Sequence, residues 1–156
     1  MPNLIRLKRG RDLPKRCRAG CDVNESFDHI LQRCYHTHHT RIQRHDHIVR
    51  HLAKRLKELG RDVKVEPHYT TSQGTTIPDL VITSDWDCQA LILDVQVVGT
   101  SVALSHTHEA KTIKYRIADL LLSTMPRTTV SALALSNRGV WATQSVCVER
   151  RRNGDN

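Results

Sequence analysis

The chain has 156 residues, of which 38% are hydrophobic and 26% are charged, and its formal net charge is +8. This length and composition fit one compact domain plus a small satellite. No run of about 18 apolar residues exists, and the basic N-terminal segment lacks the apolar stretch of a signal peptide, so we expect neither a membrane span nor secretion. We predict a nuclear, reducing environment, in which cysteines more often bind metal than form disulfides.

The charge is unevenly divided along the chain. Residues 1–61 contain 15 Lys and Arg against 6 Asp and Glu, whereas residues 62–156 contain 9 against 10. A basic segment beside a near-neutral one suggests that the first binds phosphates and the second carries the chemistry. The alternative is a solvated basic tail on an ordinary domain.

Composition and periodicity divide the chain into four segments. Residues 1–16 are predicted to be a basic linker or the remnant of a preceding domain, and residues 151–156 a tail. Residues 17–40 show neither a helical nor a strand period, so they need something other than a hydrophobic core to fold. Residues 41–150 are expected to form the main domain.

The main domain is predicted to open with a helix from about Arg41 to Leu59, which Gly60 stops. Apolar residues recur there at spacings of three and four, namely Ile48, Val49, Leu52, Ala53, Leu56 and Leu59. The opposite face carries Arg44, Arg50, Lys54, Arg55 and Lys57. We expect nucleic acid to bind this segment, at Arg44, His45, Arg50, Lys54 and Arg55.

Several strands and a second long helix follow. The segment Val63–Tyr69 alternates as a strand does, and residues 70–77, rich in Thr, Ser and Gly, predict a loop. The remaining predicted elements are strands at Pro78–Thr83 and Ala90–Val98, a helix from about Leu104 to Ser123, a strand at Thr129–Leu135, and a short helix beginning within Trp141–Val148. The almost continuously apolar Ala90–Val98 should be a central strand. This order predicts a mixed α/β sheet flanked by helices.

A cluster of cysteine and histidine lies in the segment that lacks a period. Cys17, Cys21, His29 and Cys34 have the spacing of two nearby pairs that can close around one tetrahedral zinc ion. So short a segment buries little apolar area, so the metal would supply the folding energy. The alternative is free surface thiols. Three more histidines compete with His29 as the fourth ligand, namely His36, His38 and His39, whereas Cys88 and Cys147 lie apart and are expected to be buried.

Two acids lie on adjacent predicted strands. If the strands form a hairpin centred between Trp86 and Asp87, positions whose numbers add up to 173 face each other, so Asp79 lies opposite Asp94. Opposed carboxylates repel unless a cation sits between them, and such a pair could hold the Mg²⁺ that hydrolyses a phosphodiester. Gln96 falls on the same face as Asp94. The alternative is that Asp79 only begins a strand.

A lysine follows on the second helix. Lys111 lies on one stripe with His108 and Tyr115, and it would stabilise the charge that develops during hydrolysis. The other side of the helix is apolar, with Ala110, Ile113, Ile117, Leu120 and Leu121. The alternative is a solvated polar face.

Several short pieces occur in order over about residues 17–146, nearly the whole chain. They are Cys17-Arg18-Ala19-Gly20-Cys21, His29-Ile30-Leu31-Gln32-Arg33-Cys34-Tyr35, Arg44-His45-Asp46, Val65-Glu66-Pro67, Pro78-Asp79-Leu80-Val81, Asp94-Val95-Gln96-Val97-Val98, Lys111 with Tyr115, and Asn137-Arg138-Gly139-Val140-Trp141. The ordered set resembles the C-terminal part of site-specific non-long-terminal-repeat retrotransposon proteins, which insert into ribosomal RNA genes.

The resemblance implies a zinc knuckle at residues 17–40 followed by a restriction-endonuclease-like domain of the PD-(D/E)xK type. In that family the domain nicks target DNA, and the freed 3′ end primes reverse transcription of the element's RNA. Carried over by position, Asp79 and Asp94 would bind magnesium, Lys111 would be the catalytic lysine, and Tyr115 its neighbour in the active site. The zinc ligands would be Cys17, Cys21, His29 and Cys34.

The chain departs from the family in two places. Gln96 stands where the general nuclease pattern has a lysine, which the retrotransposon branch, like this chain, carries on the next helix instead. Asp46 stands where the family usually has Asn. The resemblance also implies that the chain belongs to a larger polyprotein, whose remainder would hold the reverse transcriptase, or is a decayed or domesticated copy. The competing hypothesis is a zinc-dependent nucleic-acid-binding remnant without catalysis.

Overall fold

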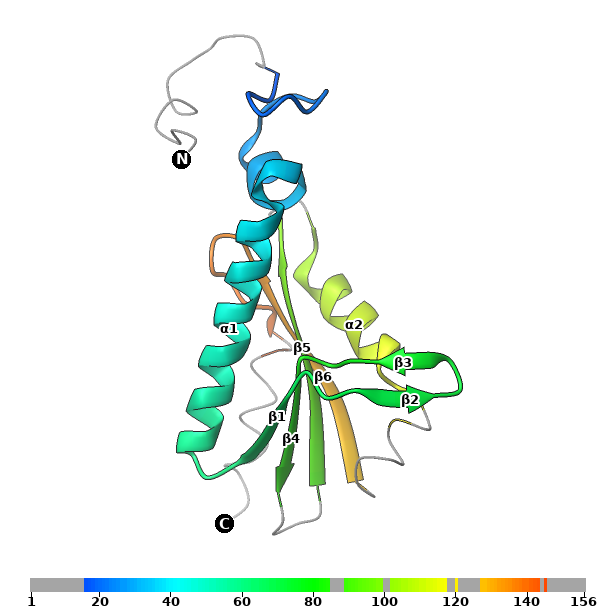
Figure 1. Ribbon diagram of the computed structural model, residues 1–156. Coiled ribbons are helices and arrows are strands. Elements are labelled where there is room, and N and C mark those ends of the chain that lie inside the picture. The colour runs from blue at the N-terminus through cyan, green and yellow to red at the C-terminus, as the bar shows by residue number, and fades with distance from the viewer. Residues whose placement is uncertain are drawn as a thin grey trace.

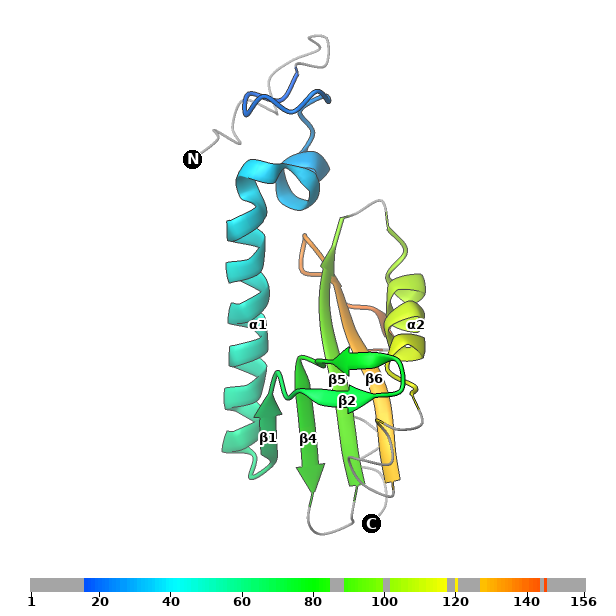
Figure 2. The same cartoon turned by 45° about the vertical axis from the view of Figure 1, so that its right-hand side comes forward.

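The computed structural model describes residues 16–84, 89–99, 102–117, 120, 127–143 and 145. Its main body has three layers, with helix α1 (His38–Glu58) on one face of a sheet and helix α2 (Leu104–Lys114) on the other (Figures 1 and 2). The segment that contains the cysteines lies beyond the N-terminal end of α1 (Figure 1). In the described part of the chain, no helix is long and apolar enough to cross a membrane.

The central sheet is mixed. Its strands are β1 (Asp62–Val65), β4 (Leu80–Ser84), β5 (Gln89–Val98) and β6 (Arg127–Ser136), arranged in the order β1-β4-β5-β6. β4 pairs antiparallel with both β1 and β5, whereas β5 and β6 are parallel. The prediction of a mixed α/β sheet flanked by helices is confirmed, with β5 as an inner strand.

The register between β4 and β5 is the one that the sequence predicts. Leu80 pairs with Leu93 and Thr83 with Ala90, so the paired positions add up to 173. β5 continues past the start of β4, and among the described residues Asp94–Val98 pair with β6 alone. This leaves one edge of β5 without a strand neighbour, just beyond Asp79.

Alternation along β5 supplies a core on each face of the sheet. Leu91, Leu93 and Val95 pack on one face with Val49 and Ala53 of α1. The other face has a smaller core, made of Val81, Ile92, Tyr115 and Leu120. Because side chains alternate between the faces, Asp94 lies on the face of Ile92, which α2 covers.

Helix α1 ends as its sequence predicts. Gly60 adopts a φ of +74°, a left-handed conformation that glycine tolerates best, and its N–H donates to Lys57 O at 2.9 Å. Before the helix, residues His29–Arg33 form one π-helical turn (η2) and Tyr35–Thr37 one 3-10 turn (η3). The helix therefore starts at His38, directly after these turns, rather than at Arg41.

The prediction for residues 63–77 is wrong in two respects. β1 ends at Val65, because Glu66 has a φ of +47° and Pro67 follows. Residues 70–77 are not a plain loop, since β2 (Tyr69–Thr71) and β3 (Gly74–Thr76) form a hairpin. Threonines favour extended backbone, and a two-residue turn joins them.

The prediction for the second helix is also partly wrong. α2 ends at Lys114, and Tyr115–Ile117 are not helical. Its apolar side does not face the sheet: Ile113 is 62% exposed, whereas Thr107 and Thr112 are buried. Trp141 forms a bridge with Leu135, and the helical residues Thr143 and Ser145 agree with the short helix predicted to begin within Trp141–Val148. Several predictions lie outside the described residues: the linker 1–15, the turn 85–88 with Cys88, most of residues 118–123, Cys147 and the tail 151–156.

Candidate functional site

Asp79 lies immediately before β4, at the point where β5 loses its neighbour. Its backbone carbonyl accepts a hydrogen bond from the Glu66 N–H at 2.9 Å. Its carboxylate Oδ2 accepts one from the Val95 N–H at 2.6 Å. The side chain thus extends the ladder between β4 and β5 by one step, and the buried Pro78 before it restricts the backbone.

Asp94 lies inside β5 and is 2% exposed. Lys111 Nζ from α2 lies 2.8 Å from its Oδ2. A buried carboxylate needs a cation or several donors beside it, and Lys111 supplies the cation. The predicted stripe of α2 is therefore turned toward the sheet, and the alternative of a solvated polar face is wrong for Lys111.

Tyr115 stands next to this ion pair. It is 2% exposed, and its hydroxyl donates to the Ile77 carbonyl at 3.3 Å. Burial raises the pKa of the Tyr115 hydroxyl, and the neighbouring Asp94 carboxylate raises it further. The hydroxyl is therefore protonated at neutral pH and serves as a hydrogen-bond donor.

His45 also reaches Asp79, a contact that the sequence did not predict. Its Nε2 lies 3.2 Å from Asp79 Oδ2 and 3.2 Å from the Val95 carbonyl oxygen. The hydrogen bond with Asp79 raises the pKa of His45 to about 9, against the effect of burial, so the ring is charged at neutral pH. The helical period contained the signal, because His45 and Arg41 continue the core-facing stripe of α1 toward its N-terminus.

The oxygen atoms around His45 suit a divalent cation. Asp79 Oδ2 and the Val95 carbonyl come from different strands, yet both lie 3.2 Å from a single atom, His45 Nε2. Asp94 precedes Val95 in the same strand. Carboxylate and carbonyl oxygens are the donors that Mg²⁺ prefers, so these groups fit a magnesium site in chemistry.

The four predicted zinc ligands come together at the other end of α1. The ligand atoms of Cys17, Cys21, His29 and Cys34 all lie within 4.8 Å of one another. The Cys34 sulfur is 3.9 Å from that of Cys17 and 3.7 Å from that of Cys21. These distances match the edge of a tetrahedron around zinc, roughly 3.8 Å for a Zn–S bond of about 2.3 Å. Gly20, with a φ of +84°, allows the turn that brings Cys21 back toward Cys17.

One ligand atom of this cluster, His29 Nε2, lacks a hydrogen-bond partner among the described residues. His29 is 5% exposed. Burial raises the pKa of the Cys17 thiol, but hydrogen bonds to its sulfur, chiefly from the Ala19 backbone, outweigh this and lower it to about 7. The competing histidines are all exposed, namely His36, His38 and His39. The cluster could therefore bind zinc with His29 as the fourth ligand.

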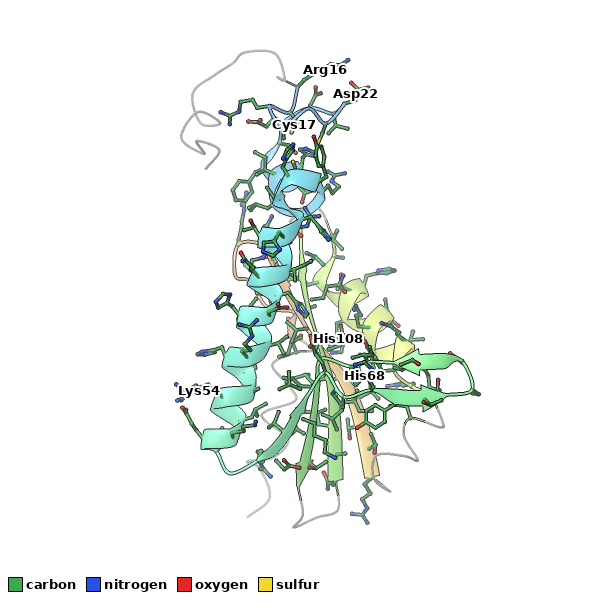
Figure 3. The ribbon with its side chains drawn as sticks, in the orientation of Figure 1. Arg16, Cys17, Asp22, Lys54, His68 and His108 are labelled. Atoms are coloured by element: carbon green, nitrogen blue, oxygen red, sulfur yellow. The ribbon has the colours of Figure 1, made fainter. Side chains whose placement is uncertain are left out.

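The predicted nucleic-acid ligands fall into two groups. Arg44 and His45 line a cleft of about 410 Å³ between α1, the end of β5 and Lys111. The other three do not line it: Arg50 contacts Asp46 at 3.5 Å, Arg55 pairs with Glu58 at 2.6 Å, and Lys54 points away from the sheet (Figure 3). Gln96 and Arg41, which begins the predicted basic segment, also line the cleft, and so does Gln32, which the sequence did not indicate.

No family model matches the chain, but individual proteins do. It is 35% identical over 159 residues to a retrovirus-related Pol polyprotein from the type-1 retrotransposable element R2 of Nasonia vitripennis, covering 96% of this chain and 15% of that protein. It is 33% identical over 153 residues to the Pol polyprotein of the type-2 element R2DM of Drosophila melanogaster, covering 94% and 14%. A Popillia japonica R2 Pol polyprotein is 37% identical over 134 residues, covering 81% and 30%. The chain thus spans less than a third of each of these relatives.

Proposed function

The homologues of this chain are Pol polyproteins of R2 retrotransposable elements, and we propose that it is the segment of such a polyprotein that nicks target DNA. The observation that supports this most directly is the contact between Lys111 and Asp94, with Asp79 beside them at the open edge of β5. Two carboxylates and a lysine at one point are the groups that metal-dependent phosphodiester hydrolysis requires.

In this proposal Asp79, Asp94 and the Val95 carbonyl hold Mg²⁺. When bound, the ion polarises the phosphate and lowers the pKa of the attacking water. Lys111 Nζ, already beside Asp94, donates to the phosphate oxygens as negative charge develops on them. His45 holds the Asp79 carboxylate in place, and the neutral Tyr115 hydroxyl lies beside Asp94, where it donates to the Ile77 carbonyl.

The proposed reaction is the hydrolysis of one phosphodiester bond. The water oxygen joins the phosphorus, the bond from phosphorus to the 3′ oxygen breaks, and that oxygen takes up a proton. The products are a 5′ phosphate and a 3′ hydroxyl on one strand. The 3′ hydroxyl would then prime reverse transcription by the remainder of the polyprotein, with the element RNA as template.

The Cys17, Cys21, His29 and Cys34 cluster is assigned to structural zinc. All four positions are taken by protein ligands, which is typical of sites that stabilise a fold and leaves no position for a substrate. The proposed partners are target DNA, such as a ribosomal RNA gene, the element RNA and the remainder of the polyprotein, and the proposed location is the nucleus.

The experiment that tests the proposal separates cutting from binding. Supercoiled plasmid is incubated with the zinc-loaded chain in Mg²⁺ or in Ca²⁺, and binding to a duplex oligonucleotide is measured in parallel. We expect nicked circles in Mg²⁺ alone, and binding under both conditions. Binding without nicking, in a chain whose fold is verified, would favour the alternative of a zinc-dependent nucleic-acid-binding module.

A further inference from the structure

The cleft beside the acids joins the zinc-binding segment to the sheet. It has a volume of about 410 Å³ and lies between η2, the N-terminal half of α1, and Val95–Val97 of β5. Lys111 closes it on the side of α2, so the cleft begins at the Lys111–Asp94 pair and extends toward the zinc ligands.

Basic side chains outnumber acidic ones among the described residues that line this cleft. Arg41 donates to the Cys34 carbonyl at 2.7 Å and to Thr37 Oγ1 at 3.1 Å, and Arg44 makes one long contact of 3.5 Å with the Leu31 carbonyl. Within the described residues, neither arginine forms an ion pair with a carboxylate. Burial, together with the charge of Arg41, lowers the pKa of Arg44, so this guanidinium is held where its charge is unfavourable.

Two buried donors in the cleft have no acceptor. Arg44 Nε and Gln32 Nε2 are both shielded from solvent and have no hydrogen-bond partner among the described residues. Buried polar atoms without partners are rare in folded proteins, and each calls for an explanation. The Arg44 guanidinium and the Gln32 amide, each with one unpaired N–H donor in this cleft, are together satisfied by an anion with several oxygens.

We infer that this cleft binds a backbone phosphate of duplex DNA next to the phosphate that Lys111 contacts in the proposed function, with Arg44 and Gln32 as its ligands. The inference rests on the proposed function, because it places this phosphate on the strand that is cut. A duplex is favoured over single-stranded nucleic acid because, among the described residues, no Phe, Tyr or Trp lines the cleft, and single strands are bound largely by stacking on such rings.

The zinc-binding segment thereby acquires a role in substrate binding. Gln32 lies in η2, between the ligands His29 and Cys34, so the metal cluster fixes the turn that carries it. A phosphate bound there would be held by the zinc segment on one side and by α1 on the other.

The test measures affinity rather than cleavage. Binding of a duplex oligonucleotide is followed by fluorescence anisotropy in Ca²⁺, at several salt concentrations, for the zinc-loaded wild type and four variants. Arg44→Ala should lower the affinity about tenfold and reduce the salt slope by about 0.9, the value for one duplex phosphate contact. Arg127→Ala is the matched control, because it removes the same charge from an exposed position at the start of β6.

A second pair of variants keeps the test independent of the folding of Arg44→Ala. Gln32→Glu replaces the buried donor by an isosteric carboxylate and should weaken binding more than Gln43→Glu, which adds the same charge to the exposed face of α1. Equal effects of these two, or wild-type affinity and salt slope for Arg44→Ala, would overturn the inference. So would a preference for single-stranded RNA that depends on the same two residues.

The outcome is separable from that of the proposed function. If the wild type binds duplex DNA through Arg44 and Gln32 but does not nick it, the phosphate site is supported and the nuclease function is contradicted. If the wild type nicks in Mg²⁺ while Arg44→Ala and Gln32→Glu bind DNA normally, the nuclease function is supported and the phosphate site is contradicted.

Discussion

Lys111 Nζ lies 2.8 Å from Asp94 Oδ2, and this contact links α2 to the inner strand β5. The Asp94 side chain is 3% exposed and that of Lys111 is 27% exposed, so the pair is largely removed from water. An isolated carboxylate at such a depth would be unfavourable. The lysine therefore stabilises the fold when no metal is present and lies where a phosphate would need a cation.

Replacing Lys111 by Ala should destabilise the protein, because Asp94 then keeps its charge without a partner. The loss of a partner in a buried pair costs about 3–5 kcal/mol, and the partial exposure of Lys111 reduces this to about 1–3 kcal/mol. Millimolar Mg²⁺ should restore part of the stability, because a cation at the acids replaces the ammonium. Urea unfolding with and without Mg²⁺ measures both effects, and Lys64→Ala on β1 serves as the exposed control. Unchanged stability without Mg²⁺ would contradict this role.

The contact between His45 and Asp79 makes the stability depend on pH. The pKa of His45 is about 9 in the folded chain, above its ordinary value of 6.5, so folding favours the charged ring. Its contribution is complete below about pH 6.5 and is lost as the pH rises through about 9. The free energy of unfolding, measured by urea without added Mg²⁺, should therefore fall over this range more steeply for the wild type than for His45→Gln. Parallel pH profiles of the two proteins would argue against a charged His45.

Loss of His29, the proposed fourth zinc ligand, should release zinc and unfold residues 17–37 without unfolding the sheet. The reason is that this segment has few apolar contacts of its own, so its order depends on the metal. His29→Ala should bind less than one zinc per chain by metal analysis, and its N-terminal segment should be cut early by protease. His36→Ala removes an exposed imidazole from the same segment and should bind zinc as the wild type does. Equal zinc content in both variants would assign the fourth ligand elsewhere.

Gly99 marks the contact between the end of β5 and the zinc-binding segment. A methyl group added there would overlap Asp28 Oδ1, whose carboxylate also pairs with Arg33 at 2.9 Å. Gly99→Ala should lower the stability by about 1–3 kcal/mol and speed proteolysis of the zinc segment. Adding Asp28→Ala removes the overlapping carboxylate and should recover part of that loss, which a double-mutant cycle measures. Additive effects would show that the two positions do not interact.

The sequence predicted those parts of the fold that depend on apolar periodicity. The core face of α1, the apolar strand β5 and the pairing of Leu80 with Leu93 follow from spacing alone. The same register predicted that Asp79 lies at the level of Asp94. The cluster of four potential zinc ligands was likewise recognisable, because three of the five cysteines fall within 18 residues and a histidine lies between them.

The prediction of which side of α2 faces the sheet failed because the buried Asp94, rather than the apolar stripe, determines that side. Periodicity placed the apolar stripe with Ile113 toward the core, but Ile113 is exposed and the stripe of Lys111 and Tyr115 faces the sheet. The buried Asp94 requires a cation, and Lys111 on α2 supplies it. The β2–β3 hairpin was missed for a different reason, since its threonines do not alternate between apolar and polar as sheet strands with one buried face do.

Other contacts of the site depend on tertiary structure. Gln32 enters the cleft through a turn that only the folded zinc cluster defines, so no local spacing indicates it. Arg50 and Arg55, by contrast, were expected to bind nucleic acid because they are basic, and both instead contact acids on their own helix. Charge alone did not distinguish a solvated helix face from a cleft.

We propose that Asp79, Asp94 and Lys111 cut DNA with the help of a divalent metal, and nicking by Asp94→Asn tests these roles most directly. The amide keeps the size of the side chain and removes the charge, so metal binding is lost with little change in packing. Nicking of supercoiled plasmid in Mg²⁺ should fall by at least about 100-fold, a typical minimum for the loss of a group that stabilises the transition state. Duplex binding in Ca²⁺ should persist, and Glu109→Gln, on the exposed face of α2, should nick as the wild type does. Wild-type nicking by Asp94→Asn would contradict the account.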